Sequence, residues 1–428
     1  MIKNNNQLAI SELRKTALQI AEAGLESINT EKAFLAGFVY NPRINSLKVL
    51  GKKYGLSKFR NIYCVAFGKA AFAGITSVSK ILGTRLSAGF AIDVSDRYPN
   101  IPNIQFRTGT HPHPSEQNVK ATQELVEFLS RVKKDDLVLC LISGGGSALL
   151  CHPNNLRVEE QASILKQLMN SGADIFEMNA VRKHLSSVKG GQLAQLVYPA
   201  KLISLIFSDV PGNDLSTIAS GPTVLDKTTV REAQRILERY DILKKAGVVK
   251  VELKETPKEN KYFKNVENIL FVSAKTALMA MRERAEDLGY EVKVFSEQFQ
   301  GEVKKLSQEI IQAGDKKHLC LLGAGESTVE VKGQGMGGRN QELALRILPF
   351  LHQHQVFMSL ASDGHDNSES AGAVVDSSTL RRAKNLQLNL ESYLQNNDSF
   401  NFLETVGDNI HTGLTGSNVA DLFILLNK

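Results

Sequence analysis

The sequence predicts an α/β protein made of two doubly wound, Rossmann-like domains with the active site in the cleft between them. Apolar runs with the composition of buried strands alternate with helical patterns along most of the chain. Several runs end in glycine-rich or aspartate-bearing loops, where open α/β sheets bind their ligands. A chain of 428 residues is also too long for one ordinary core. A polar stretch at 251–264 separates two series of elements, so the predicted domains are 1–250 and 265–428, with the last strand open to either sheet.

Composition and charge exclude several classes of protein. Apolar residues make up 42% of the chain and charged residues 22%, as in globular enzymes. The formal net charge of +6 suits small anionic substrates, and because no basic stripe carries interleaved aromatic residues we expect no nucleic-acid partner. Without a secretory segment or an apolar run of membrane-spanning length, we expect a cytoplasmic protein that contacts no membrane. The cysteines lack metal-ligand spacing and are predicted to be reduced core residues: Cys64, Cys140, Cys151 and Cys320.

The first domain opens with a helical pattern over 7–28, and a strand over 61–67 follows it and ends at Gly68 and Lys69. Small residues come next at helical spacing, so Lys69 is predicted at a helix start, where it can reach an anion held over the turn. The spacing is not that of a Walker A loop, which has two glycines and a Ser or Thr after the lysine. The sequence HPHP at 111–114 is predicted to be a rigid loop and not a metal site.

A stronger candidate follows the predicted strand at 136–142, where three consecutive glycines stand between two serines. Such a run destabilises regular structure, so we interpret it as a nest of N–H groups for a carboxylate or a phosphate. The alternative is a tight crossover from strand to helix. The candidate binding residues are Ser143, Gly144, Gly145, Gly146 and Ser147.

Polar and charged residues also gather at 174–197, which is predicted to form two short helices around a break at two glycines. Charges on a helix usually indicate a solvated face, and we expect this for most of them. Arg182 is kept as a candidate ligand of the substrate or of a phosphate. The cluster consists of Asn179, Arg182, Lys183, His184 and Lys189.

Two aspartates end predicted strands. Asp209 follows the strand at 201–207, and Asp363 follows the strand at 355–361. A carboxylate at the carboxyl end of a strand can serve as a metal ligand or as a base, and which of the two holds the metal stays open. The second domain is predicted to begin as a parallel sheet, with strands at 268–273, 291–295 and 318–322.

A glycine-rich loop at 323–342 organises the second domain, with one short strand predicted at 328–331 and a helix predicted from Arg339. An arginine at a helix start offers a bidentate fork to a phosphate. The glycines are expected to let the loop approach a ligand and move as a lid. Further candidates for phosphate binding are Gly337, Gly338 and Asn340.

The same loop contains a G-x-G-x-x-G pattern at Gly333, Gly335 and Gly338. The strand before it is short and half polar, unlike the first strand of a dinucleotide-binding fold, so hydride transfer is the weaker interpretation. A lysine, an arginine, two aspartates and glycine nests, without a serine elbow or a zinc cluster, fit phosphoryl transfer better.

The chain resembles the glycerate 2-kinase family, whose members have an N-terminal glycerate-kinase domain and a C-terminal MOFRL domain. The motifs that carry the resemblance appear in the family's order and span nearly everything after about residue 60. They are GKAA (68–71), GTHPHP (109–114), LISGGGSALL (141–150), NAVRKHLSSVKGGQLA (179–194), SDVPGNDLSTIASGPTV (208–224), GESTVEV (325–331), GQGMGGRNQELAL (333–345), SDGHDNSESAGAVVD (362–376), NNDSF (396–400) and TGLTGSNVADL (412–422).

The resemblance implies ATP-dependent, Mg²⁺-assisted phosphorylation of D-glycerate at its 2-hydroxyl, giving 2-phosphoglycerate. The family's active-site lysine falls on Lys69 and its arginine on Arg339. Asp209 and Asp363 complete the catalytic candidates, and both are candidate metal ligands. The implied partners are glycerate and ATP, and a homodimer is compatible with the sequence.

The sequence departs from the family pattern after SALL, at Cys151 and His152, and in the loop that holds His365 and Asn367. None of these differences removes a charged group that the mechanism needs. Proteins of this kind have also been named hydroxypyruvate reductases, which would need a nicotinamide site. A third interpretation, a non-catalytic nucleotide sensor, would not require the lysine and the arginine.

Overall fold

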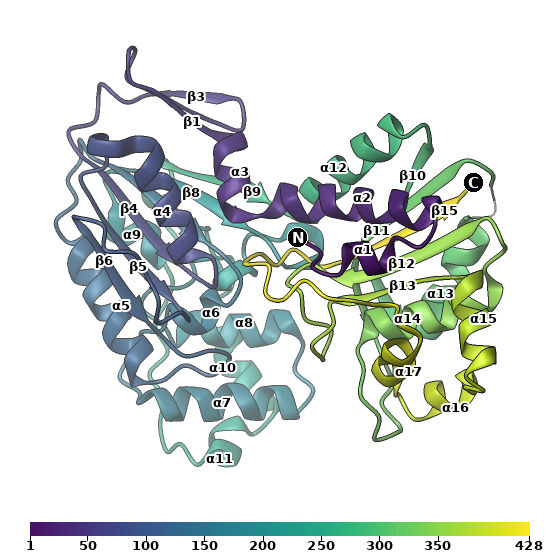
Figure 1. Cartoon of the computed structure of the whole chain (residues 1–428). Coiled ribbons are helices and arrows are strands. Elements are labelled where there is room, and N and C mark those ends of the chain that lie inside the picture. Colours follow the sequence, from purple (N-terminus) through teal and green to yellow (C-terminus); the bar gives the residue numbers. More distant parts are fainter. Residues whose placement is uncertain (315) are drawn as a thin grey trace. The chain divides into compact units, whose positions relative to one another are not determined.

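The structure is a computed structural model, and it describes residues 1–314 and 316–428. Its contacts divide the chain into two compact units, which we name for their place in the sequence (Figure 1). The central unit comprises residues 33–208 and 213–271, and the terminal unit comprises residues 1–32, 209–212 and 272–428. Each unit contains a six-stranded sheet with helices packed on it, so the predicted α/β class is confirmed.

The sheet of the central unit has the strand order β6-β5-β4-β7-β8-β9. Every pair from β6 to β8 is parallel. The strands β4, β5, β7 and β8 are largely buried and mostly apolar, as expected for a sheet covered on both faces, whereas the edge strand β6 is more polar. The first strand, β4, lies between the second and the fourth, so the strand order reverses between β4 and β7. That reversal is the switch point at which doubly wound sheets bind ligands. The strands are β4 (Ile62–Phe67), β5 (Ala88–Asp93), β6 (Ile104–Thr108), β7 (Leu137–Ile142), β8 (Lys201–Phe207) and β9 (Val266–Val272).

The helices of the central unit begin where the sequence provides caps. Asp174 accepts a hydrogen bond from the Glu177 amide at the start of α8, and Thr229 does the same for Glu232 at the start of α10. A separate antiparallel sheet precedes β4 and consists of β1 (Phe38–Asn41), β2 (Ser46–Val49) and β3 (Lys52–Gly55). The helices are α3 (Thr30–Gly37), whose first residues fall in the terminal unit, α4 (Ala71–Leu82), α5 (Glu116–Leu129), α6 (Gly146–Leu149), α7 (Val158–Asn170), α8 (Ile175–His184), α9 (Gln192–Val197), α10 (Val230–Arg239) and α11 (Ile242–Ala246).

The sheet of the terminal unit has the order β10-β11-β15-β12-β13-β14. Strands β10 and β11 are parallel, but the last strand, β15, lies antiparallel between β11 and β12. The last strand therefore belongs to the second sheet, which is mixed and not wholly parallel. The strands are β10 (Glu291–Glu302), β11 (Leu319–Thr328), β12 (Gln355–Ala361), β13 (Gly372–Asp376), β14 (Asn409–Ile410) and β15 (Asp421–Asn427).

Two expectations for the strands are wrong. The strand predicted at 268–273 is β9, which extends the sheet of the central unit and does not start the second sheet. The short strand predicted at 328–331 does not form as a separate element, because β11 runs on to Thr328 and residues 329–338 are irregular. The alternation of apolar and polar residues at 328–331 does not show whether they extend the preceding strand or form a new one.

The aromatic rings of Phe357 and Phe423 pack together, with centroids 5.9 Å apart, in the core of the terminal unit. The helices that cover this sheet are α1 (Asn5–Leu8), α2 (Glu12–Ile28), α12 (Ala274–Asp287), α13 (Val303–Ala313), α14 (Arg339–Ile347), α15 (Ser377–Asn385), α16 (Leu390–Gln395) and α17 (Ser399–Val406). Short 3₁₀ turns in the chain are η1 (Gly83–Arg85), η2 (Pro211–Asn213), η3 (Ile218–Ser220), η4 (Asn260–Tyr262) and η5 (Leu348–Phe350).

The contacts of helix α2 assign the start of the chain to the terminal unit, although the predicted boundaries place it in the first domain. Arg14 is completely buried there and forms ion pairs with two carboxylates. Its Nε lies 2.8 Å from Oδ2 of Asp376, and its Nη1 lies 2.6 Å from Oδ1 of Asp408. An amphipathic helix signals that it packs on something, but the pattern does not say on which sheet.

All four cysteines are buried and unpaired, as predicted. No helix that the structure describes is both long enough and apolar enough to cross a bilayer.

Candidate active site

The switch point of the central unit brings two predicted loops together. After β4, the backbone N–H of Lys69 donates to the carbonyl of Gly144 at 2.9 Å, and the N–H of Ala70 donates to Oγ of Ser143 at 3.1 Å. Gly68 has φ of +119°, and a Cβ at this position would collide with Ser143. The glycine is therefore required for the two loops to approach each other.

The three-glycine loop turns sharply into the short helix α6. Gly145, with φ of +80°, is the left-handed residue that precedes this helix. A Cβ on Gly145 would lie 3.3 Å from Cγ of Lys69 and 3.1 Å from Cδ2 of His111, so these three residues surround one small space. Among the described residues, the amides of Gly144 and Gly145 have no hydrogen-bond partner. Two free N–H groups beside a lysine can receive an anion.

His111 borders this space, although the sequence indicated only a rigid loop there. Partial burial lowers the pKa of His111, and the charges of Lys69 and His113 lower it further. The imidazole is therefore neutral at physiological pH. The position at the end of the third parallel strand of the sheet was the signal that could have identified this residue.

A chain of hydrogen bonds leads from the glycine loop to Arg182. Oγ of Ser147 lies 3.2 Å from Oγ of Ser220, which donates at 2.9 Å to Oδ1 of Asn179. The same oxygen accepts a bond of 3.1 Å from Nη1 of Arg182. Asn179 and Arg182 meet because they stand three residues apart on α8. The structure thus places the predicted Arg182 beside the predicted loop.

The expectation that the charges near α8 face solvent is wrong. Lys183, His184 and Lys189 are all buried. Nζ of Lys183 lies 3.0 Å from Oδ1 of Asp226, and Nζ of Lys189 donates to the carbonyl of Leu150 at 2.7 Å. The local sequence could not show this, because the segments that cover these side chains come from other parts of the chain, both earlier and later.

In the terminal unit, Arg339 is the first residue of α14, as predicted, and two carboxylates hold its guanidinium. Nε lies 2.6 Å from Oδ2 of Asp421, at the start of β15, and Nη2 lies 3.2 Å from Oε1 of Glu326, on β11. Burial raises the pKa of Asp421 to about 7, although Arg339 opposes this effect. The arginine side chain remains 36% exposed, so a ligand can reach it.

The N-terminus of α14 is already occupied by Asp366. Its carboxylate accepts hydrogen bonds from the amides of Asn340 at 3.1 Å and of Gln341 at 2.8 Å. Nδ2 of Asn340 also donates to Asp366, and its Oδ1 accepts from Ser359. The predicted phosphate ligand Asn340 therefore has both its backbone and its side-chain donors engaged within the protein. Of the predicted group at this helix start, Arg339 alone presents a charged side chain toward solvent.

The glycine-rich loop before α14 is held by the segment 396–400. Asn397 accepts bonds from the amides at 332 and 333, Asn396 from the amide at 334, and Asp398 from the amide at 336. A Cβ on Gly333, Gly335 or Gly337 would collide with this segment. The glycines thus allow this loop to lie close against the segment 396–400 of the same chain. These contacts do not support the expectation that the loop moves as a lid. The amides needed by a dinucleotide fingerprint are also engaged.

The two candidate aspartates both belong to the terminal unit. Asp363 lies two residues after β12, and its Oδ1 accepts a bond of 3.0 Å from the His365 amide. Asp209 lies two residues after β8. Among the described residues, no three His, Cys, Asp or Glu side chains form a cluster that could hold a metal. Mg²⁺ in kinases is held by one or two carboxylates and by the phosphates of the nucleotide, so single aspartates fit it.

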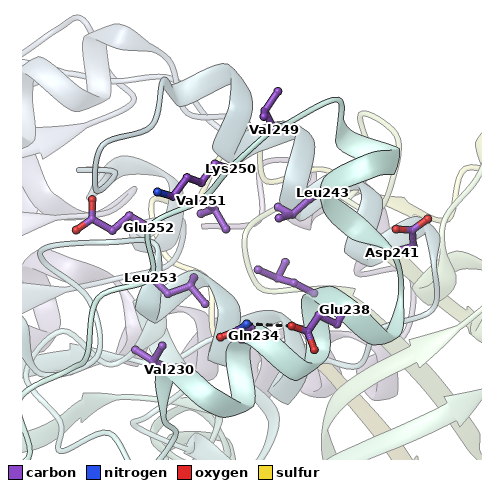
Figure 2. Close-up of a pocket in the computed structure, with 11 residues that line it drawn as sticks. Val230, Gln234, Glu238, Asp241, Leu243, Val249, Lys250, Val251, Glu252 and Leu253 are labelled. Atoms are coloured by element: carbon purple, nitrogen blue, oxygen red, sulfur yellow. Dashed lines mark hydrogen bonds between the residues drawn. The ribbon is translucent and has the colours of Figure 1, made fainter.

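A pocket of about 560 Å³ lies elsewhere in the central unit, between α10, α11 and residues 249–253 (Figure 2). Figure 2 shows Gln234 bonded to Glu238 on its wall, at 2.9 Å. None of the predicted site residues lines this pocket.

Comparisons with known proteins agree with the motifs. A family profile described as a domain of unknown function, DUF4147, matches residues 16–254, and one described as the MOFRL family matches residues 319–421. A D-glycerate 2-kinase of Thermotoga maritima is 34% identical over 426 residues, which cover 96% of this chain and 98% of the relative. A glycerate 2-kinase of Pyrococcus horikoshii is 33% identical over 439 residues, with 96% and 98% covered.

A protein of Agrobacterium vitis that is provisionally named a hydroxypyruvate reductase is 36% identical over 340 residues, which cover 76% of this chain and 77% of the relative. Among solved structures, a glycerate kinase of Thermotoga maritima is similar with a TM-score of 0.86 at 32% identity, covering 97% of this chain and 99% of that one. A protein of Pyrococcus horikoshii has a TM-score of 0.85 at 31% identity, with 98% and 99% covered.

Proposed function

The chain belongs to the glycerate kinase family, and on that premise we propose that it phosphorylates D-glycerate at the 2-hydroxyl, with ATP as donor, giving 2-phosphoglycerate and ADP. The observation that carries the proposal is the pair of loops at the switch point, where Lys69 stands beside the free amides of Gly144 and Gly145. A positive charge and two N–H donors suit a substrate with one carboxylate and a transferring phosphoryl group.

The proposed reaction is an in-line displacement. The 2-hydroxyl oxygen bonds to the γ-phosphorus as the bond to the bridging oxygen of ADP breaks, and the hydroxyl proton passes to a carboxylate. Lys69 and Arg339 neutralise the charge on the moving phosphoryl group, and the loop 143–147 binds the substrate. Gly337, Gly338 and Asn340 then act by placing Arg339, since the donors of Asn340 are engaged within the protein.

We further propose that Asp209 or Asp363 holds Mg²⁺, which neutralises phosphate charge when it is bound, and that the other aspartate orients the 2-hydroxyl. Asp363 uses one carboxylate oxygen for the His365 amide, which fixes its direction. A carboxylate fixed by its own loop can serve in either role.

The test of the function is a coupled assay of ADP release with D-glycerate and ATP, run beside an assay of NADH oxidation with hydroxypyruvate. We expect ADP release that depends on both substrates, 2-phosphoglycerate as product, and no NADH oxidation. NADH oxidation without ADP release would overturn the proposal and restore the reductase.

We expect Asp209→Asn and Asp363→Asn to differ in how they respond to magnesium. The variant that lacks the metal ligand should need more Mg²⁺ and lose the larger part of its turnover. The variant that lacks the orienting carboxylate should lose less than the 10²–10⁴-fold typical of general bases, because a loose phosphoryl-transfer transition state needs little base assistance. The measurement is turnover across a magnesium titration. Near-normal turnover of both variants at every magnesium concentration would refute both roles.

A further inference from the structure

Three polar side chains of the central unit lie near the short helix α6. The chain of hydrogen bonds from Ser147 through Ser220 reaches Asn179 and Arg182. Lys189 returns to the same short helix, because its ammonium donates to the carbonyl of Leu150, three residues after Ser147. Asn179, Arg182 and Lys189 therefore adjoin the C-terminal end of the loop 143–147 and the short helix α6. We call these three residues the cation cluster.

The two positive charges of the cation cluster, on Arg182 and Lys189, are not compensated by a carboxylate in the part of the chain that the structure describes. Among the residues that the structure describes, no carboxylate oxygen lies within 4.0 Å of a nitrogen of Arg182 or Lys189. Lys183, on the same helix, shows the usual arrangement, since it pairs with the buried Asp226 at 3.0 Å. An unpaired buried cation is costly to a folded protein. Burial accordingly lowers the pKa of Arg182 and brings that of Lys189 to about 8.

Asn179 supplies an independent observation. It is 3% exposed, and its Oδ1 accepts two hydrogen bonds, from Ser220 and Arg182. Its Nδ2 has no partner among the described residues. Buried amide groups are nearly always satisfied, so an orphaned donor beside two unpaired cations indicates an absent acceptor.

We propose that Asn179, Arg182 and Lys189 form the recognition site for the carboxylate of the acceptor substrate. The site offers two positive charges and a neutral donor to one small anion, and it lies on the glycine loop that would hold the rest of the molecule. The inference rests on the proposed function for the identity of the acid, D-glycerate.

The burial of the cluster favours a carboxylate over a nucleotide phosphate. Lys189 is 1% exposed, so a ligand must insert a small group to reach it. Lys69, on the other side of the same loop, is exposed and suits the larger and more highly charged phosphates.

The sharpest test is Asn179→Asp, which provides the missing carboxylate from within the protein. We expect this variant to be at least as stable to heat as the wild type, because its charge pairs with Arg182 and Lys189. We expect the KM for D-glycerate to rise by on the order of 10- to 100-fold, since the built-in carboxylate repels and replaces that of the substrate. The Kd for ATP should not change. Asn100→Asp, in an exposed loop, is the control that adds the same charge elsewhere.

Lys189→Met provides a second, independent variant, and direct titration of D-glycerate without nucleotide separates binding from turnover. The methionine should also raise the KM for glycerate and leave the Kd for ATP unchanged, whereas Lys166→Met, at an exposed position of α7, should change neither. An unchanged glycerate KM in both variants would overturn the inference. A loss confined to ATP affinity would overturn it also, and would assign the cluster to a phosphate.

The proposed function and the inference fail in different ways. Wild-type protein that binds D-glycerate in the titration, and loses this binding in Asn179→Asp, but releases no ADP would refute the kinase activity and support the carboxylate site. Wild-type protein that phosphorylates D-glycerate while Asn179→Asp binds it normally would support the kinase and refute the site.

Discussion

Replacing Arg339 with lysine is expected to lower the rate of phosphoryl transfer in a single turnover by on the order of 10³-fold or more, the range found for arginine fingers in GTPases. The guanidinium lies between Asp421 and Glu326, with its Nε 2.6 Å from Asp421 and its Nη2 3.2 Å from Glu326. This arrangement fixes the plane of the guanidinium, and the side chain stays 36% exposed. A lysine provides a single point charge and cannot reproduce that fork for a phosphoryl group.

The measurement is single-turnover transfer from ATP with saturating D-glycerate. Arg346→Lys is the matched control, because Arg346 lies on the same helix and pairs with Glu342 at 2.7 Å, away from the proposed site. Lys69→Ala should impair the same step, so the double variant should lose less than the product of the two single losses. An Arg339→Ala enzyme that loses only its affinity for ATP would make the arginine a ground-state ligand and refute the prediction.

Replacing Arg14 with methionine is expected to lower the free energy of unfolding by about 3–5 kcal/mol, the usual effect of removing one partner of a buried ion pair. The change removes the cation that lies 2.8 Å from Asp376 and 2.6 Å from Asp408, and only Asp408 keeps a second ion pair, with Arg382. Unfolding in urea, compared with the exposed control Lys15→Met, measures the loss. A decrease below about 1 kcal/mol, the range of surface pairs, would contradict the prediction.

The same ion pair predicts how stability depends on pH. Burial alone would raise the pKa of Asp376, but Arg14, together with hydrogen bonds from Ser378, more than offsets this and lowers the pKa to about 2. Because the folded-state pKa lies below the unfolded value of 3.8, the stabilisation is complete above about pH 5 and is lost as the pH falls through the folded-state pKa of about 2. The stabilisation amounts to about 2 kcal/mol. In Arg14→Met this acid-dependent loss should largely vanish, and an unchanged acid profile would exclude the assignment.

The sequence predicts a strand or helix well where neighbouring residues alone determine it. The strand at 201–207 is β8 to the residue, and the helix after the glycine loop begins at Arg339, as predicted. Both follow from apolar runs that end at residues with strong preferences for turns or caps. The sequence predicts Lys69 and the loop at 143–147 separately, each at the end of a strand, and the structure brings them together because β4 and β7 are neighbours in the sheet.

Long-range partners could not be predicted. The sequence predicts a flexible ligand loop for the glycines at 333 to 337, but in the structure they allow close contact with Asn396 and Asp398, about sixty residues later in the chain. The sequence predicts a solvated Lys183, because its partner Asp226 lies 43 positions later and cannot be inferred from the residues around the lysine. In both cases the local sequence shows which kind of contact the residue can make. It does not show which distant segment of the chain provides the partner.

The position of β15 has a consequence for the order in which the protein folds during synthesis. This strand joins β11 to β12 in the middle of its sheet, yet it occupies residues 421–427. The central unit is encoded entirely within residues 33–271, so its core can close while the ribosome is still translating the rest of the terminal unit. The first helices of the terminal unit, α1 and α2, are synthesised at the beginning of translation. Its sheet, however, stays in two separate parts until β15 has been synthesised. A nascent chain stalled before residue 421 should therefore expose two unpaired strand edges and depend on chaperones.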